Sequence, residues 1–202
     1  AIEGLQKALL RQNLKLAFYW DLDVSHPHFT AMQMLTLRGV LLRDEDRRIR
    51  PDEPLTRAEA AQLLYRAFDL WPSVSNAHFS DVPYQHPAFR EIETLFDHGA
   101  LVHFGIEPQW PKEGPYDAAQ HAGFRQRNNL GELKPDLPVT ADEFARLIDH
   151  LATGAGPLRE RRATSAVPRS AAVDAIGGQL LTRACACEVL WRVIDSGQSR
   201  GI

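Results

Sequence analysis

Three stretches of the chain share one hydrophobic pattern, and each begins at a threonine. Thr56, Thr140 and Thr182 are followed by apolar residues at offsets of 4, 7, 8 and 11 positions. Apolar residues at this spacing lie on one face of an α-helix. The pattern therefore predicts three helices that share a start and a buried face. Their apolar residues are Ala60, Leu63, Leu64 and Ala67, then Phe144, Leu147, Ile148 and Leu151, then Ala186, Val189, Leu190 and Val193.

The residues before these threonines repeat as well. Residues 50–55 and 134–139 both read as a basic residue, Pro, Asp, any residue, Pro and an aliphatic residue. Proline and aspartate at this density predict a turn that leads into the helix. Residues 180–184 keep the aliphatic residue, the Thr, an Arg and an Ala but lack the prolines. The chain thus carries two clear copies of one unit and a third, degenerate copy.

A second, shorter helix is predicted ahead of the first two copies. Both segments follow an Asp-Val pair and a His-Pro pair, and proline fits the first turn of a helix because its missing N–H has no partner there. Both end at a glycine, so we expect Gly39 and Gly99 to stop these helices. The matched residues are Phe29, Met32 and Leu35 with Phe89, Ile92 and Leu95, introduced by Asp23-Val24 and His26-Pro27 and by Asp81-Val82 and His86-Pro87.

No stretch alternates as a strand would, so the predicted fold class is all-α. The chain has 202 residues, of which 44% are hydrophobic and 24% charged, as in ordinary globular proteins. Its net charge of −3 argues against nucleic acid as a partner. No apolar run is long enough to span a membrane, and we expect no signal peptide within these residues. The chain begins with Ala rather than Met, so we expect a processed protein or a piece of a longer one.

No pattern of side chains in the sequence indicates catalysis, a cofactor or a metal site. No nucleophile elbow, phosphate-binding loop or dinucleotide motif occurs, so the chain is not expected to be an enzyme. Cys185 and Cys187 are too close in sequence on a helix to pair, and without a neighbouring His they make a poor zinc site. His26 and His28 lack a third ligand nearby, and the match of His26 to His86 favours a local role in the turn.

Taken as an ordered set, these motifs resemble the S-layer homology family. The resemblance is carried by Phe79-Ser80-Asp81-Val82, residues 89–99, the two Pro-Asp turns and Thr56-Arg57-Ala58-Glu59. It implies an all-α, pseudo-threefold bundle of helix-loop-helix repeats with ligand grooves between them. It also implies a non-catalytic module that anchors a larger protein to cell-wall polysaccharide, at the bacterial cell envelope or outside the cell.

The repeats give the expected domain organisation. An N-terminal helical segment covers residues 1–20, and the first repeat covers residues 21–72. The second repeat covers residues 79–152 and holds a long insertion at 103–131. Residues 153–202 form a linker and the degenerate third repeat.

The resemblance implies where a ligand would bind. The Thr-Arg-Ala-Glu segment of the family lies at the grooves, which makes Thr56, Arg57 and Glu59 candidate binding residues. Arg183 holds the same place in the third repeat, and the aromatic Trp110 in the insertion could stack on sugars or dock a partner protein. A guanidinium suits this role because it can grip a carboxylate or phosphate with two hydrogen bonds.

The same residues also allow simpler interpretations. Thr56 and Glu59 form a capping-box pattern, which by itself explains both residue types. Arg57 could instead be a solvated or ion-paired surface arginine, and Trp110 could fill a gap over the bundle. The second repeat has Ala141 at the arginine position, and the third has Cys185 at the glutamate position, so at most one groove keeps the full signature.

A second function remains open beside anchoring. Residues 2–14 loosely resemble a C-terminal segment of bacterial FAD-dependent oxidoreductases. In that case the chain is a structural or assembly domain of a larger enzyme and binds no glycan. Its partner is then an upstream catalytic domain of the same polypeptide.

Overall fold

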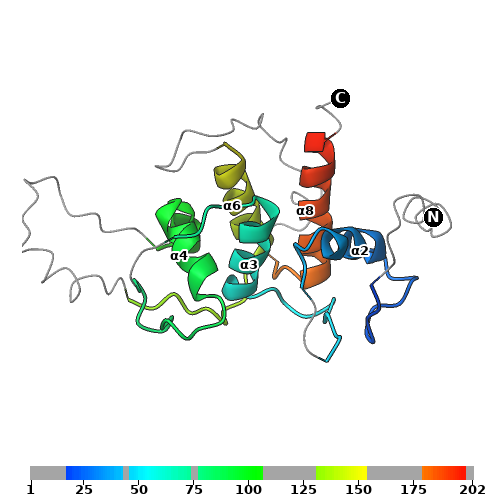
Figure 1. The fold of residues 1–202 in the computed structure, drawn as a ribbon, viewed down its shortest axis with the longest axis horizontal. Coiled ribbons are helices and arrows are strands. Elements are labelled where there is room, and N and C mark those ends of the chain that lie inside the picture. Colours follow the sequence, from blue (N-terminus) through cyan, green and yellow to red (C-terminus); the bar gives the residue numbers. More distant parts are fainter. Residues whose placement is uncertain (1–16, 43–45, 74–76, 107–130, 154–178, 199–202) are drawn as a thin grey trace, which may run out of the picture. The chain divides into compact units, whose positions relative to one another are not determined.

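The computed structural model describes residues 17–42, 46–73, 77–106, 131–153 and 179–198, and over this part of the chain it contains helices and no β-strand (Figure 1). The predicted all-α class is therefore confirmed. The chain divides into two compact units, residues 1–55, 138–142 and 167–202 and residues 56–137 and 143–166. The helices are α2 (Phe29–Leu37), α3 (Arg57–Ala67), α4 (Phe89–Asp97), the 3-10 helix η1 (Ala100–Phe104), α6 (Ala141–Thr153) and α8 (Arg183–Gln198).

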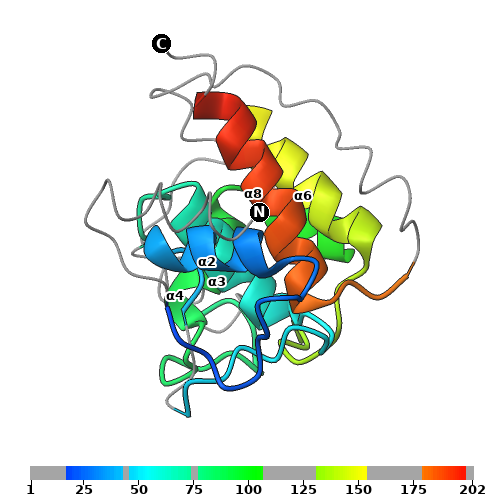
Figure 2. The same ribbon diagram turned by 90° about the vertical axis from the view of Figure 1, so that its right-hand side faces the viewer.

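The first unit is built around α2 and α8, which pack side by side (Figures 1 and 2). Both helices bury the apolar face that the sequence predicts: Met32 and Leu35 on α2 and Ala186 and Leu190 on α8 are fully buried. Gly39 follows α2 with a left-handed φ of 70°, so it stops the helix as predicted.

The second unit contains α3, α4, η1 and α6 from residue 143 onward. Ala60, Leu63 and Leu64 on α3 and Leu147 and Ile148 on α6 are buried, which confirms the predicted faces of both helices. The other predicted stop is also confirmed, since the glycine after α4, at position 99, has a φ of 72°.

The segments that lead into α3, α6 and α8 join in a closed ring of backbone hydrogen bonds. Leu55 donates to Leu181, Leu181 donates to Val139, and Val139 donates to Leu55, over 2.7, 2.9 and 2.8 Å. All three side chains are buried. Each residue is the aliphatic one just before the repeated threonine, so the ring joins the positions that the sequence predicts to be equivalent.

The helix starts themselves are also tied to the turns of other repeats. The first N–H groups of a helix have no partner within it, so another acceptor must be found. Here the first residue of each of the three helices donates to a carbonyl group just before another repeated threonine. The pairs are Arg57 to Leu137 (3.0 Å), Ala141 to Gln179 (3.1 Å) and Arg183 to Glu53 (3.0 Å).

The Pro-Asp turns are held by an aspartate at the start of each repeat. The Asp81 carboxylate accepts the backbone N–H groups of Leu133 (2.9 Å) and Lys134 (2.7 Å). Asp21 does the same for the first repeat, accepting from Ile49 (3.0 Å) and Arg50 (2.8 Å). A charged acceptor thus fixes two backbone groups at each turn.

The predicted match between Asp23-Val24 and Asp81-Val82 is therefore wrong. The Asp23 carboxylate accepts hydrogen bonds from Ser25, within its own turn, and Val24 is 52% exposed whereas Val82 is fully buried. The counterpart of Asp81 is Asp21. The sequence pattern pairs the wrong aspartate with Asp81 because Asp21 and Asp23 stand two positions apart and only Asp23 precedes a valine.

We predict that Asp21→Ala lowers the free energy of unfolding by about 1.5–3 kcal/mol, because two backbone N–H groups lose a charged acceptor. Asp23→Ala is the matched control and should change stability little, since its carboxylate serves only an exposed turn. Urea unfolding of both variants measures the difference. An equal or larger loss in Asp23→Ala would contradict the assignment of Asp21.

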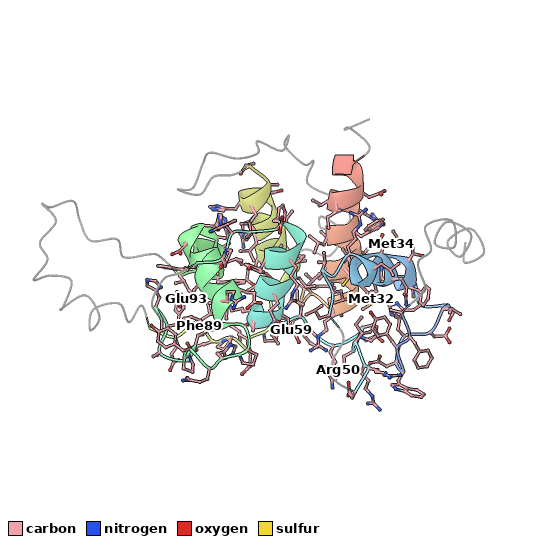
Figure 3. All side chains as sticks on the ribbon, viewed as in Figure 1. Met32, Met34, Arg50, Glu59, Phe89 and Glu93 are labelled. Carbon is pink, nitrogen blue, oxygen red and sulfur yellow. The ribbon has the colours of Figure 1, made fainter. Side chains whose placement is uncertain are left out.

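Two buried polar side chains also occupy matching places on α2 and α4. The Gln33 amide exchanges two hydrogen bonds of 2.8 Å with the backbone of Ala17. Glu93, which is labelled on α4 in Figure 3, accepts the backbone N–H of His78 at 2.9 Å. Both side chains are 1% exposed. They tie the chain ahead of each repeat to the helix, a role that a hydrophobic pattern does not reveal.

Three histidines meet in the second unit. His150 Nε2 donates to the backbone oxygen of His98 over 2.8 Å, and the rings of His103 and His150 lie 5.2 Å apart. The buried Nε2 atoms of His98 and His103 have no hydrogen-bond partner among the described residues. Burial lowers the pKa of His98, and so does His150, whereas Asp97 opposes the shift. Burial also lowers the pKa of His103, helped by His150 and Arg146 and opposed by Asp149.

These shifts predict that the protein loses stability on mild acidification. A histidine whose pKa is lowered by folding binds its proton more readily when unfolded, so its contribution is complete above the ordinary pKa of about 6.5 and falls below it. The urea midpoint should therefore drop as the pH falls from about 7.5 to about 5.5, before most carboxylates titrate. His103→Phe should reduce this drop. A midpoint that stays constant or rises would contradict the prediction.

Candidate functional site

The candidate site begins at the first turn of α3, where Thr56 and Glu59 cap the helix. The Thr56 hydroxyl accepts the backbone N–H of Glu59 at 3.3 Å, and the Glu59 carboxylate accepts the backbone N–H of Thr56 at 2.9 Å. Figure 3 shows Glu59 at this end of the helix. The predicted capping box is confirmed, and both side chains serve the local backbone.

Arg57 points into the second unit and is only 9% exposed. Its Nη1 donates to the backbone oxygen of Leu133 over 2.6 Å, and its Nη2 donates to that of Phe104 over 3.1 Å. The guanidinium carbon lies 4.8 Å from the centre of the Phe104 ring. Arg57 is therefore not the solvated surface arginine that one interpretation of the sequence expected, but a buried cation that links α3 to the turn before α6.

The charge of Arg57 is only partly compensated. Glu143 Oε1 lies 3.9 Å from Nη2, at the long end of ion-pair distances. Burial lowers the pKa of Arg57, while Glu143 and Asp81 counteract the shift. The Nε atom is buried and has no hydrogen-bond partner among the described residues. An unpartnered buried donor is costly, because the N–H group has given up its hydrogen bond to water.

Arg183 has a similar arrangement at the first turn of α8, within the first unit. Its Nη1 donates to the Glu53 carboxylate over 3.0 Å and to the backbone oxygen of Arg50 over 3.4 Å. Arg183 thus binds the Pro-Asp turn of the first repeat, much as Arg57 binds the turn of the second. Its carboxylate partner differs in being 57% exposed.

The structure places the predicted site residues unevenly. Thr56, Arg57 and Glu59 share one helix start in the second unit, Arg183 belongs to the first unit, and Trp110 lies outside the described residues. The insertion expected at 103–131 overlaps η1 at its beginning, and its residues 107–130 also lie outside the described part.

Sequence reasoning missed the groups that surround Arg57. Leu133 and Phe104 contribute backbone oxygens, which any residue type carries, so no motif could reveal them. Glu143 follows Thr140 at the same spacing as Glu59 follows Thr56, but its position beside Arg57 depends on the fold.

The histidines before α2 and α4 take the local role that the sequence favours. The His26 ring accepts the backbone N–H of His28 at 3.2 Å, and the His86 ring accepts that of Ala88 at 3.1 Å. Among the described residues, no three His, Cys, Asp or Glu side chains are grouped so that they could hold a metal ion.

A comparison with known protein families gives a match for part of the chain. No curated protein matches the chain. No helix among the described residues is both long enough and apolar enough to cross a membrane. The family model of the S-layer homology domain matches residues 21–61, a stretch that contains α2, the first Pro-Asp turn, the capping box and Arg57. Over residues 21–61, the chain therefore carries an S-layer homology domain.

Proposed function

We propose that this chain attaches a larger protein to an anionic polysaccharide of the bacterial cell envelope. The observation that carries the proposal is the S-layer homology match at residues 21–61, which includes Thr56-Arg57-Ala58-Glu59. S-layer homology domains are non-catalytic anchoring modules that bind cell-wall polysaccharides and imply association with the cell envelope. The proposal extends this property of the family to the three repeats of the chain.

In this proposal, Arg57 holds a carboxylate or phosphate group of the glycan. Its support is the place of Arg57 within the matched residues 21–61 and the incomplete compensation of its guanidinium charge by Glu143, 3.9 Å away. Thr56 and Glu59 fix the start of α3 so that the guanidinium is held in place. Arg183 serves a second binding position, and Trp110 stacks on a sugar ring.

Co-sedimentation with purified bacterial cell envelopes tests this function. The full chain should sediment with intact envelopes and should stay in solution once the wall polysaccharide has been stripped. Arg57→Lys keeps the charge but loses the planar fork, so it should weaken the apparent affinity about tenfold. The matched control is Arg48→Lys, the same substitution at a side chain that is 59% exposed, and it should sediment like the unchanged chain.

Each outcome is decisive because folding is checked separately by thermal melting of every variant. Equal sedimentation of folded Arg57→Lys and Arg48→Lys would remove Arg57 from the binding site. Failure of the unchanged chain to sediment with any intact envelope would overturn polysaccharide anchoring itself. The alternative role as a domain of a larger enzyme rests on residues 2–14, which lie outside the described part of the chain.

A further inference from the structure

A cysteine, a histidine and a glutamate lie in a row within the first unit. His28 stands at the start of α2, and its Nε2 atom is 3.7 Å from the sulfur of Cys185 on α8. Its other ring nitrogen, Nδ1, is 3.5 Å from Glu188 Oε2. The contact forms because α2 packs against α8, as both views of the ribbon show (Figures 1 and 2).

The order of these groups is that of an activated nucleophile. A carboxylate at Nδ1 favours the histidine tautomer that carries its proton there, which leaves the lone pair of Nε2 facing the thiol. Glu188 is itself held in place, because Arg192 Nε donates to its other oxygen over 2.8 Å. Cys185, Glu188 and Arg192 follow one another at intervals of three and four residues, so they share one face of α8.

The position of Cys185 supports reactivity, whereas that of Cys187 does not. Cys185 is partly exposed and lies in the first turn of α8, where its backbone N–H donates to the Thr182 hydroxyl at 3.2 Å. Cys187 is fully buried, and burial raises the pKa of its thiol to about 12. It therefore stays protonated and out of reach of reagents.

The helical repeat itself does not require this group. Cys185 occupies the position at which the other two long helices carry Glu59 and Glu143, and His28 occupies the position of Ala88 in the second repeat. Both departures from the repeat pattern meet at a single contact.

We propose that Cys185 is a reactive thiol that exchanges with the disulfides of small thiols, with His28 as its base and Glu188 as a positioning residue. His28 Nε2 takes the proton of the Cys185 thiol, and the thiolate attacks one sulfur of the disulfide. The disulfide bond breaks as the bond to Cys185 forms, and the departing thiolate takes the proton back from His28. Cys185 is oxidised to a mixed disulfide, and one equivalent of the small thiol is the reduced product.

Further ionisable side chains lie around His28. The His26 ring lies 5.8 Å from that of His28, and His26 Nε2 is 3.5 Å from the Asp52 carboxylate. On α8, Glu188 lies against His28, and Arg192 is paired with Glu188. A change in rate with pH therefore reports this cluster as a whole, and variants are needed to separate its members.

The test uses the full chain and the aromatic disulfide dithionitrobenzoate, which releases a coloured thiolate. The unchanged chain should release one equivalent rapidly, and peptide mass spectrometry should locate the adduct at Cys185. His28→Ala should slow the release at least about tenfold, and Glu188→Gln should slow it by a smaller factor. Cys187→Ala is the matched control and should react like the unchanged chain.

The pH profile separates activation from a merely structural role. In His28→Ala the rate should depend on pH differently than in the unchanged chain, because the variant lacks the base, and the profile of Glu188→Gln should lie between the two. Release of two equivalents would show that a variant has unfolded and exposed Cys187, and His28→Gln would then provide the same comparison. Superimposed profiles, or no adduct at Cys185, would overturn the proposal.

Discussion

Phe144→Ala is expected to lower the free energy of unfolding by about 3–5 kcal/mol, the usual range for removing a buried phenylalanine ring. Phe144 lies in the second unit on α6 and is 1% exposed. The repeat pattern suggests instead that alanine would be tolerated at position 144, because Ala60 and Ala186 stand at the same place in the other two long helices. Those alanines are themselves fully buried, so each helix has a neighbourhood fitted to its own residue. Alanine at position 144 would leave a cavity.

Urea unfolding measures this loss against a matched control in the same repeat. Leu137→Ala also truncates a large apolar side chain, but Leu137 is 43% exposed, so its loss should be well under half as large. Comparable losses in the two variants would mean that α6 does not bury Phe144, and the predicted register of the helix would then be wrong.

The helices could be predicted from the sequence because their signals are local. A threonine, a glutamate three positions later and apolar residues at helical spacing all lie within a few turns of chain. The confirmed capping box at Thr56 and Glu59 and the glycine stops at positions 39 and 99 belong to this class. The residues that form each of these caps and stops lie within one short segment of the chain.

Features that depend on distant backbone groups were not predictable in this way. The ring of Leu55, Val139 and Leu181 uses only N–H and carbonyl groups, which carry no residue signature. Asp21 was overlooked for the same reason, since its partners are the backbone N–H groups of Ile49 and Arg50. A motif compared by residue identity could not distinguish it from Asp23.

The Cys185 cluster shows the same limit for side chains. The sequence offers Cys185 no histidine nearby, and the partner that the fold supplies is 157 positions away. One local signal was present, because Cys185, Glu188 and Arg192 share a helix face. Only the packing of α2 against α8 brings His28, the proposed base, to this face of α8.

Arg57→Met is expected to lower the free energy of unfolding by about 2–4 kcal/mol. Methionine fills much of the same space but donates no hydrogen bond, so the backbone oxygens of Leu133 and Phe104 lose their donors. Each buried group left without a partner costs about 1–3 kcal/mol, and relief of the buried charge and of the unpartnered Nε offsets part of the sum. Thermal and urea unfolding measure the change, with Arg48→Met as the control at an exposed position.

The stability of Arg57→Met also bears on binding, because the Arg57 guanidinium is proposed both to hold the turn before α6 and to bind an anion. If Arg57 both holds the turn before α6 and grips an anion, added wall polysaccharide should raise the melting temperature of the unchanged chain and leave that of Arg57→Met unmoved. Equal stabilisation of both proteins would assign Arg57 to the fold alone. A variant as stable as the unchanged chain would instead contradict the two hydrogen bonds to Leu133 and Phe104, since their loss cannot be free in a buried site.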